Sequence, residues 1–270
     1  MNVVCTAHLT SLIRKHIEVM YSGSEYGSFC FRDDNMQIQT VDSLSVCVCM
    51  LEIKKTIFCR YILPNDIFVK FNIRSFLNSI KGSESPSSLM MFGFDGGCLT
   101  VSIRNGSEDI FENLNHITTK TENNDNGTCY LLGSSIDTTT YYSIPSSPSE
   151  CPCYTMHVSD FTCTVLDLAV GGGHIQIEMK GTQTKWSTYF ETGQLTIQMD
   201  LNTNKGKYGI IRPATRGYSH VYLTKFLKHT CNLASLYTNV RINLLPDGLI
   251  MIELESVLGI RTVVVLLPTI

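Results

Sequence analysis

Short apolar segments separated by turn-forming residues make up most of the chain. Apolar and polar residues alternate within them, a pattern that is typical of β-strands. Strands are predicted in the first half at residues 27–32, 36–41, 45–52, 56–63, 88–94 and 98–104. In the second half they are predicted at 174–180, 185–191, 195–201, 239–245, 249–255 and 260–267. Asp-Gly-Gly at 95–97 and Pro-Asp-Gly at 246–248 are predicted to form tight turns, because glycine adopts positive φ at little cost.

Four other segments place apolar residues three and four positions apart, which predicts one buried face of an α-helix. Ser159 or Asp160 is the expected N-cap of the third helix, Ser219 that of the fourth, and the glycines at 171–173 are expected to end the third. The order helix, strands, helix, strands therefore occurs twice, which indicates an internal duplication. The apolar positions are Leu9, Leu12, Ile13, His16, Ile17 and Met20; Ile73, Phe76, Leu77 and Ile80; Phe161, Val165, Leu168 and Ala169; and Val221, Tyr222, Phe226 and Leu227.

A segment of different composition separates the two halves. Residues 113–153 are rich in Asn, Thr, Ser and Pro, with one strand-like patch at 128–136. Residues 137–152 show neither a helical nor a strand period and contain three prolines, which favours a surface linker. We therefore expect an N-terminal subdomain at 1–133, an interdomain connector at 134–153 and a C-terminal subdomain at 154–270.

Composition excludes several classes of protein. The chain has 270 residues, 43% hydrophobic and 17% charged, which excludes a disordered tail protein. It has no apolar run of about 18 residues and no basic segment before an apolar N-terminal core, so neither a membrane span nor a secretory signal is expected. Eleven cysteines, an odd number, favour a reducing, intracellular compartment. Cys47-x-Cys49 and Cys151-x-Cys153 have shorter gaps than common zinc sites, so no metal is expected.

No catalytic motif is present in the sequence. It lacks a GxSxG elbow, an HExxH pair, a Walker A loop and a dinucleotide fingerprint. The glycines at 171–173 follow a predicted helix instead of opening one, so they are not expected to bind phosphate. The seven histidines are scattered, and the carboxylates form no cluster. Neither an enzyme nor a cofactor is therefore expected.

The charge on the predicted helices indicates a binding function. The formal net charge is −3, yet three of the four helices carry mainly positive side chains away from their apolar stripes. The third helix offers Thr162, Thr164 and Asp167 there and no basic residue. Locally segregated positive charge favours a surface that faces a polyanion. The residues concerned are Arg14, Lys15, Arg74, Lys81, Lys225 and Lys228.

Together these features resemble the sliding DNA clamps of the PCNA family. Residues 38–46 (IQTVDSLSV) are similar to the family's strand and loop with a Met-Asp-Ser core, and residues 71–81 (FNIRSFLNSIK) to its second helix. Residues 222–228 (YLTKFLK) resemble the fourth helix, and residues 265–268 (VLLP) the C-terminal strand. The resemblance covers nearly the whole chain and is weakest at 105–150.

The resemblance implies an α+β DNA-clamp fold of two similar subdomains, each with β-sheets outside and two helices inside. Such chains close head to tail into a ring, most often a trimer, which tethers DNA polymerase and other replication and repair proteins to double-stranded DNA. The expected location is the nucleus or a viral replication site. Client peptides of the family dock beneath the interdomain linker. By position, that pocket consists of Val41, Val46, Ile144, Pro145, Leu249, Val265, Leu267 and Pro268.

Ring closure implies that edge strands of neighbouring subunits pair. By resemblance these edges lie near 88–94 and 185–191. The unusual third helix and the aliphatic Val264 and Val265, where aromatic residues often occur, mark a divergent member. A subunit of the heterotrimeric DNA-damage checkpoint clamp and a non-ring viral processivity factor therefore stay open. So does a β-rich interaction protein that never touches DNA, and whether a clamp loader is needed is also left open.

Overall fold

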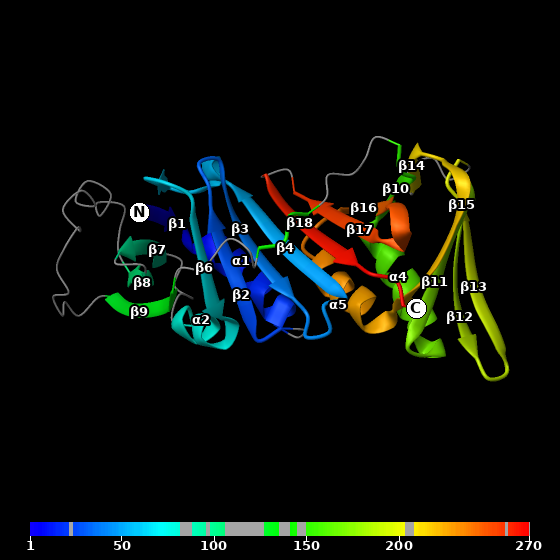
Figure 1. Cartoon of the computed structure of the whole chain (residues 1–270), viewed down its shortest axis with the longest axis horizontal. Helices are drawn as coiled ribbons and strands as arrows, with labels where there is room; N and C mark the ends of the chain where they lie inside the picture. The colour runs from blue at the N-terminus through cyan, green and yellow to red at the C-terminus, as the bar shows by residue number, and fades with distance from the viewer. Residues whose placement is uncertain are drawn as a thin grey trace. The chain divides into compact units, whose positions relative to one another are not determined.

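One order of strands and helices occurs twice along the chain (Figure 1). The computed structural model describes residues 1–21, 24–81, 88–95, 98–105, 127–134, 141–144, 150–202, 208–256 and 259–269. Within these residues, each half has a strand, a helix, five strands, a second helix and three strands. This repetition confirms the duplicated order predicted from the sequence.

The chain divides into two compact units. The first consists of Met1–Thr40 and Glu52–Tyr141, and the second of Val41–Leu51 and Tyr142–Ile270. The division falls within strand β4 (Cys47–Lys54), so the loop before this strand belongs to the second unit although it lies early in the sequence.

The first half forms antiparallel strands and two helices. β5, β1, β7, β8 and β9 form a five-stranded sheet in that order, and β6, β2, β3 and β4 follow one another in a second sheet. The strands are β1 (Asn2–Cys5), β2 (Tyr26–Phe31), β3 (Asn35–Val41), β4 (Cys47–Lys54), β5 (Arg60–Ile62), β6 (Ile67–Asn72), β7 (Ser88–Asp95), β8 (Cys98–Asn105) and β9 (Gly127–Ser134). The helices are α1 (Ala7–Tyr21), α2 (Ile73–Ser79) and the short η1 (Lys55–Ile57).

Helices α1 and α2 pack against each other and against strands of both sheets. Leu9, Ile13 and Ile17 on α1 are buried, as the three- and four-residue spacing predicts. The Asn72 side chain accepts a hydrogen bond from the Ser75 amide (2.9 Å) and so caps α2. Phe29 and Phe76 meet edge to face, with centroids 5.3 Å apart, inside this core.

The second half repeats this arrangement. β14, β10, β16, β17 and β18 are neighbours in one sheet, and β13, β12, β11 and β15 form a four-stranded sheet. The strands are β10 (Cys153–His157), β11 (His174–Gly181), β12 (Gln183–Phe190), β13 (Gly193–Asp200), β14 (Tyr208–Arg212), β15 (Ala214–Leu223), β16 (Asn239–Leu244), β17 (Ile250–Glu255) and β18 (Ile260–Leu266). The helices are α4 (Val158–Leu168), α5 (Thr224–Ala234) and the short η4 (Ala169–Gly171) and η5 (Pro246–Gly248).

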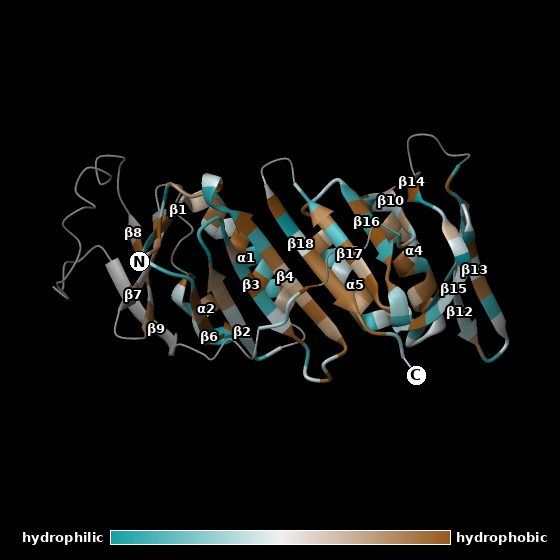
Figure 2. Ribbon diagram, turned by 45° about the horizontal axis from the view of Figure 1, so that its top comes forward, coloured by the Kyte–Doolittle hydropathy of each residue, from teal (hydrophilic) through white to brown (hydrophobic). Residues whose placement is uncertain are grey.

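A buried tryptophan organises the core of the second unit. Trp186 lies edge to face against Phe161 of α4, with centroids 6.1 Å apart, and donates its indole N–H to the Tyr154 hydroxyl (3.1 Å). Hydrophobic and polar residues alternate along the strands of this unit in Figure 2. Its helices therefore cover the apolar faces of its sheets, as strand periodicity requires.

Several sequence predictions were wrong in detail. Val221 and Tyr222 belong to β15, paired with β11, and α5 begins only at Thr224. Its N-cap is Leu223, which has no capping side chain. The N-cap of α4 is His157, whose ring accepts from the Ser159 amide, so neither Ser159 nor Asp160 has this role.

The segment predicted as one strand at 56–63 consists of η1 followed by the short β5. The predicted turn at 95–97 includes residues outside those described. No helix among the described residues has the length and apolar character needed to cross a bilayer.

Candidate functional site: an apolar patch, a free sheet edge and basic helix faces

A buried apolar cluster of the second unit is only partly covered. Ile144, Leu249 and Val48 are half-buried and pack against it. Aliphatic side chains therefore continue from the core to the surface at this point. The buried members are Met50, Cys151, Leu245, Met251, Val263 and Val265.

The C-terminal residues border the same cluster. The Leu267 amide donates to the Val46 carbonyl (2.9 Å), and the Thr269 amide donates to the Val221 carbonyl (2.8 Å). These bonds fix the segment after β18, although the Leu267 side chain is 42% exposed. We call Val46, Ile144, Leu249, Val265 and Leu267 the connector patch.

Two tyrosines hold the turn that carries Leu249. The Tyr222 hydroxyl donates to the Gly248 carbonyl, and the Tyr218 hydroxyl donates to the carbonyls of Gly248 (3.0 Å) and Leu249 (3.2 Å). Burial raises the pKa of both phenols, which therefore keep the protons that they donate. Gly248 has φ 79°, and a Cβ there would lie 2.5 Å from His220 Nδ1, so only glycine fits.

Asp42 orders the loop at the other border of the connector patch. Its carboxylate accepts hydrogen bonds from the amides of Leu44 (2.9 Å), Val46 (2.6 Å) and Cys47 (2.6 Å). Ser45 has φ 56°, an unusual value for a residue with a side chain, and its amide donates to the Asp42 carbonyl (2.9 Å). The loop thereby presents Leu44 with its side chain 61% exposed.

Asp42→Ala is expected to lower the free energy of unfolding by about 1–3 kcal/mol, because three amides lose their acceptor together. Urea unfolding measures this loss, and amide hydrogen exchange at Leu44, Val46 and Cys47 should become faster. Ser43→Ala, in the same loop and with an exposed side chain, is the matched control. Unchanged stability and exchange in Asp42→Ala would show that the loop is ordered by other contacts.

The structure gathers most of the residues that the sequence nominated for partner binding. Val265 is a member of the cluster, and Ile144 and Leu249 pack on it. Leu267, two residues after Val265, is hydrogen-bonded to Val46, and the next residue, Pro268, is half-buried. Val41 is half-buried at the start of the Asp42 loop. Pro145 lies outside the described residues. Sequence reasoning missed Leu44, whose apolar side chain in a polar loop was an available signal.

The nominated basic residues of the first unit lie on α1 and α2, except Lys81, which follows the C-cap of α2. Lys15, Arg74 and Lys81 are exposed. Arg14 is half-buried and forms an ion pair with Glu18 (Nε to Oε1, 2.8 Å), one helical turn later. The positive charge available to a ligand therefore comes mainly from the other three residues.

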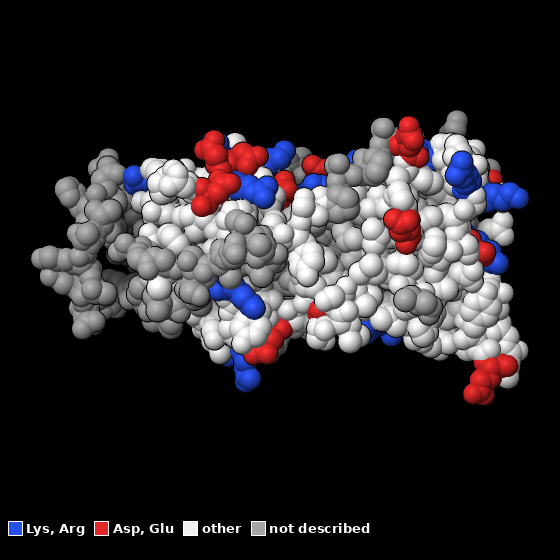
Figure 3. Space-filling model, viewed as in Figure 1, with Lys and Arg blue, Asp and Glu red and all other residues white. Residues whose placement is uncertain are grey.

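In the second unit, Lys225 and Lys228 are exposed on α5. Burial, and secondarily the charge of Lys225, lowers the pKa of His229, so this histidine adds no charge at neutral pH. The neighbouring α4 instead exposes Cys163, Leu166 and Asp167. Of the three residues that the sequence placed on its polar side, Asp167 is exposed, Thr162 is half-buried and Thr164 is buried, so the prediction was wrong for Thr164. On the face drawn in Figure 3, charged side chains form small mixed groups separated by uncharged surface.

Strand β13 forms a free edge of the four-stranded sheet. The Leu201 amide donates to the Thr182 carbonyl (3.0 Å), which extends the register in which Gln183 faces Asp200. In an antiparallel ladder, residue pairs that exchange main-chain hydrogen bonds alternate with pairs that do not. Leu201 and Thr182 are a bonded pair, so Thr196 and Ser187 are a non-bonded pair. The Thr196 amide therefore points away from β12. The same holds for the amides of Gln194 and Gln198.

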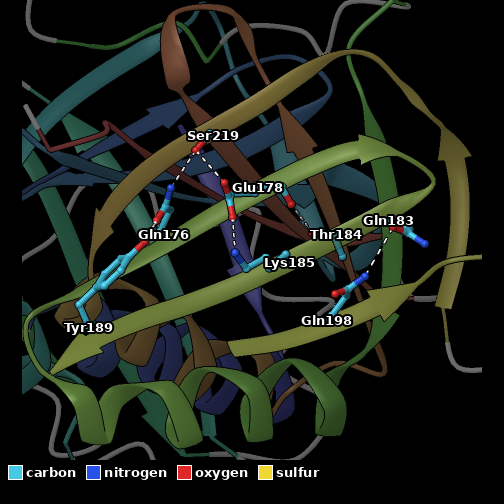
Figure 4. A network of polar contacts seen from close by, with 8 residues as sticks. All are labelled: Gln176, Glu178, Gln183, Thr184, Lys185, Tyr189, Gln198 and Ser219. Carbon is cyan, nitrogen blue, oxygen red and sulfur yellow. Dashed lines mark hydrogen bonds and ion pairs between the residues drawn. The ribbon is translucent and has the colours of Figure 1, made fainter. Parts of the chain in front are cut away.

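One face of this sheet is polar (Figure 4). Glu178 and Lys185 form an ion pair (3.1 Å), and the Tyr189 hydroxyl donates to the Gln176 side chain (2.7 Å). The Gln176 amide group in turn donates to Ser219 (2.9 Å). These bonds join polar side chains of β11, β12 and β15 to one another.

Apolar side chains are exposed beside this edge. Leu166 and Val170 come from α4 and η4, and Phe190 and Leu195 from β12 and β13. The elements are in contact, since α4 packs on β13 and a Cβ on Gly171 would lie 2.9 Å from the Phe190 ring. We call these four residues the edge patch.

The sheet edges expected from the sequence were wrong. β7, which contains residues 88–94, lies between β1 and β8, and β12 lies between β11 and β13. Among the described strands, the edges of the five-stranded sheet are β5 and β9, and the edges of the four-stranded sheet are β13 and β15. Interior strands already use both rows of main-chain groups, so they cannot pair with another chain.

The cysteines are free thiols in the described residues, and no three His, Cys, Asp or Glu side chains there lie in a group that could hold a metal. Burial raises the pKa of Cys49 to about 12 and also raises that of Cys47. Such thiols behave as small apolar side chains.

Comparisons with known proteins identify the fold. No protein-family model and no curated protein matches the sequence. Among solved structures, the chain is similar to the PCNA2–PCNA3 complex from Sulfolobus tokodaii, with a TM-score of 0.71 and 15% sequence identity over 99% of each chain. The chain therefore has the PCNA-like clamp fold, which confirms the α+β clamp architecture expected from the sequence.

Proposed function

We propose that this chain is a subunit of a sliding clamp, a ring that encircles duplex DNA and tethers DNA polymerase and other client proteins. The observation that carries the proposal is the clamp fold over 99% of the chain. Exposed basic side chains on α1, α2 and α5 support it. A clamp acts as a scaffold, so we assign no catalytic residue and no cofactor.

The DNA-facing charge is assigned to Lys15, Arg74, Lys81, Lys225 and Lys228, with Arg14 contributing less because of its ion pair. A few lysines and arginines in each subunit, multiplied by the symmetry of a ring, attract phosphates without reading sequence. Such contacts permit sliding. Helix α4 contributes little, because its exposed side chains are apolar or acidic.

The double replacement of Lys81 and Lys225 by Glu is expected to weaken DNA association and polymerase processivity. Each lost phosphate contact lowers the slope of log K against log salt by about one. Titration of fluorescent duplex DNA at several salt concentrations measures the slope.

The control is the double replacement of Lys54 and Lys180 by Glu. Both lysines are exposed, one lies in each half of the chain, and both are on strands away from the helix faces. The two variants have equal net charge. Equal loss of DNA binding in both would show that only overall charge matters and would contradict the helix-face assignment.

Ring closure is assigned to β13 of one subunit and β9 of the next, which are the edge strands adjacent to the interior strands β12 and β8. The other edges of the same two sheets, β15 and β5, are the alternatives. The edge patch adds apolar area beside β13. A mass of about 90 kDa, three times the chain's 30.2 kDa, is expected for a homotrimer. The similar solved structure is a complex of PCNA2 with PCNA3. A chain that stays at 30.2 kDa alone would therefore favour a heteromeric ring, including a checkpoint-type clamp.

The connector patch is assigned to client peptides that carry an aliphatic anchor and aromatic residues. Val41, Pro145 and Pro268 complete the proposed docking surface. Its apolar side chains other than Val265 are half-buried or exposed, and partner proteins typically cover such surfaces. Replication and repair proteins at the nucleus or a viral replication site are the clients we propose. Whether a loader opens the ring depends on how tightly the β13 edge closes.

A further inference from the structure

The side chain of Tyr141, in the connector, makes three contacts within the first unit. Its hydroxyl donates to Oε1 of Gln37 on β3. Its ring meets Phe68 of β6 edge to face, with centroids 5.7 Å apart, and the Arg32 guanidinium lies 5.8 Å from the ring centre. One side chain is thus held by three segments that are distant in sequence.

The acceptor is itself held in position. Gln37 is 7% exposed, and its Nε2 donates to Oε2 of Glu52 on β4 (3.2 Å). This bond orients the amide group so that its oxygen faces Tyr141. Burial raises the pKa of Tyr141, so its hydroxyl keeps the proton that the contact requires. The contact is therefore a directed hydrogen bond at a prepared site.

The residues that follow Tyr141 differ sharply in environment. Tyr142 is 52% exposed. Ile144, only three residues after Tyr141, packs on the apolar cluster of the second unit. Tyr141 is therefore held within the first unit and Ile144 within the second, and two residues of the chain separate them.

We propose that the contact between Tyr141 and Gln37 is a latch that holds residues 142–144 of the connector in the conformation that client peptides bind. This inference rests on the proposed function of the connector patch. A latched connector has lost its conformational freedom before binding, so a peptide need not order it. Tyr141 is a positioning residue that acts through Ile144, and it does not itself touch the peptide.

The test uses the full chain and the variant Tyr141→Phe, which removes only the hydroxyl. The probe is a fluorescein-labelled synthetic peptide with one aliphatic anchor and two aromatic residues. We expect its Kd to rise by about threefold to tenfold, the effect of one lost directed hydrogen bond. Amide hydrogen exchange at Tyr142, Ser143 and Ile144 should become faster. Ser143→Ala, which removes a hydroxyl from an exposed neighbour, should alter neither quantity.

A second comparison separates positioning from direct contact. In the Ile144→Asp background, Tyr141→Phe should weaken the peptide no further, because the latch acts only through Ile144. An unchanged Kd in Tyr141→Phe, with Ile144→Asp still weakening the peptide, would overturn the latch and leave the proposed function standing. If Ile144→Asp has no effect, the proposed function of the patch fails. In that case, amide hydrogen exchange at residues 142–144 still tests whether Tyr141 restrains this segment. An exchange rate that is the same in Tyr141→Phe and the parent would overturn the restraint as well.

Discussion

If the proposed ring closes at β13, Thr196→Pro is expected to convert it into single chains. The Thr196 amide points away from β12, so proline removes a donor at the free edge and leaves the ladder inside the subunit intact. The Thr196 side chain faces Ser187 on the polar side of the sheet, so little apolar packing is lost. One main-chain hydrogen bond is worth about 0.5–1.5 kcal/mol, and the proline ring also obstructs the incoming strand. We expect the dissociation constant of the ring to rise tenfold or more, measured by light scattering across a dilution series.

Thr196→Ala is the control for this substitution, because it removes the same side chain and keeps the amide. A second variant, Leu195→Asp, places a charge in the edge patch and should dissociate the ring without changing any main-chain donor. Thermal unfolding verifies that all three proteins fold. If the parent assembles and Thr196→Pro and Leu195→Asp both retain its mass, the ring does not close at β13.

The duplicated architecture could be predicted because local patterns encode it. The buried stripe of α1 and the alternation in β17 appear directly as helix and strand periods. Strand β15 was not predicted, because Val221 and Tyr222 have a helix-like spacing from Phe226 and were assigned to the fourth helix. In the structure, Tyr222 pairs with Ile175 of β11, nearly fifty residues away in the sequence. Such a non-local pairing overrides the local spacing.

The order of strands in the sheets could not be predicted for the same reason. Nothing local in β12 or β13 says which of the two is the outer strand, because each reads as a polar and apolar alternation. The edge is decided by which strand finds a second partner, and this depends on the whole sheet. The correction moves the proposed interface from β12 to the adjacent β13.

The resemblance nominated the apolar residues of the candidate site, but it did not indicate the polar contacts that hold them in place. Resemblance brought together Ile144, Leu249 and Val265, and the structure packs all three on one cluster. It did not reveal that Asp42 orders the neighbouring loop or that Tyr141 reaches Gln37. The latter two are 104 positions apart, and neither has an unusual sequence environment. Hydrogen bonds between distant polar residues leave no periodic signal in a single sequence.

These supports also explain how an aliphatic patch can present a defined surface. Asp42 fixes one border through backbone amides, and Tyr218 and Tyr222 fix the turn before Leu249. Polar contacts with definite geometry thus position apolar side chains that have no directional preference of their own. The patch can consequently stay partly exposed without collapsing onto its neighbours.

Ile144→Asp is expected to weaken a client peptide by tenfold or more. Burying an aliphatic anchor against an apolar patch is worth about 1.5–3 kcal/mol, and a carboxylate in the same place would also have to lose its hydration. Ile144 packs on the buried cluster as a half-buried residue, so its replacement should leave the core largely intact. Titration of the labelled peptide against parent and variant measures the change in Kd, and thermal unfolding of both proteins verifies that the variant is folded.

The control for this prediction is Ser143→Asp, which adds the same charge at an exposed neighbouring residue. This variant shows how far the added negative charge alone weakens the peptide, because Ile144 and its apolar contact are kept. An effect of charge would also decrease as salt is added. DNA association should be the same in the parent, Ile144→Asp and Ser143→Asp, because the basic helix faces are unchanged. If the peptide binds parent and Ile144→Asp equally well, clients dock elsewhere on the clamp. If Ser143→Asp weakens the peptide as strongly as Ile144→Asp, charge and not apolar contact controls docking.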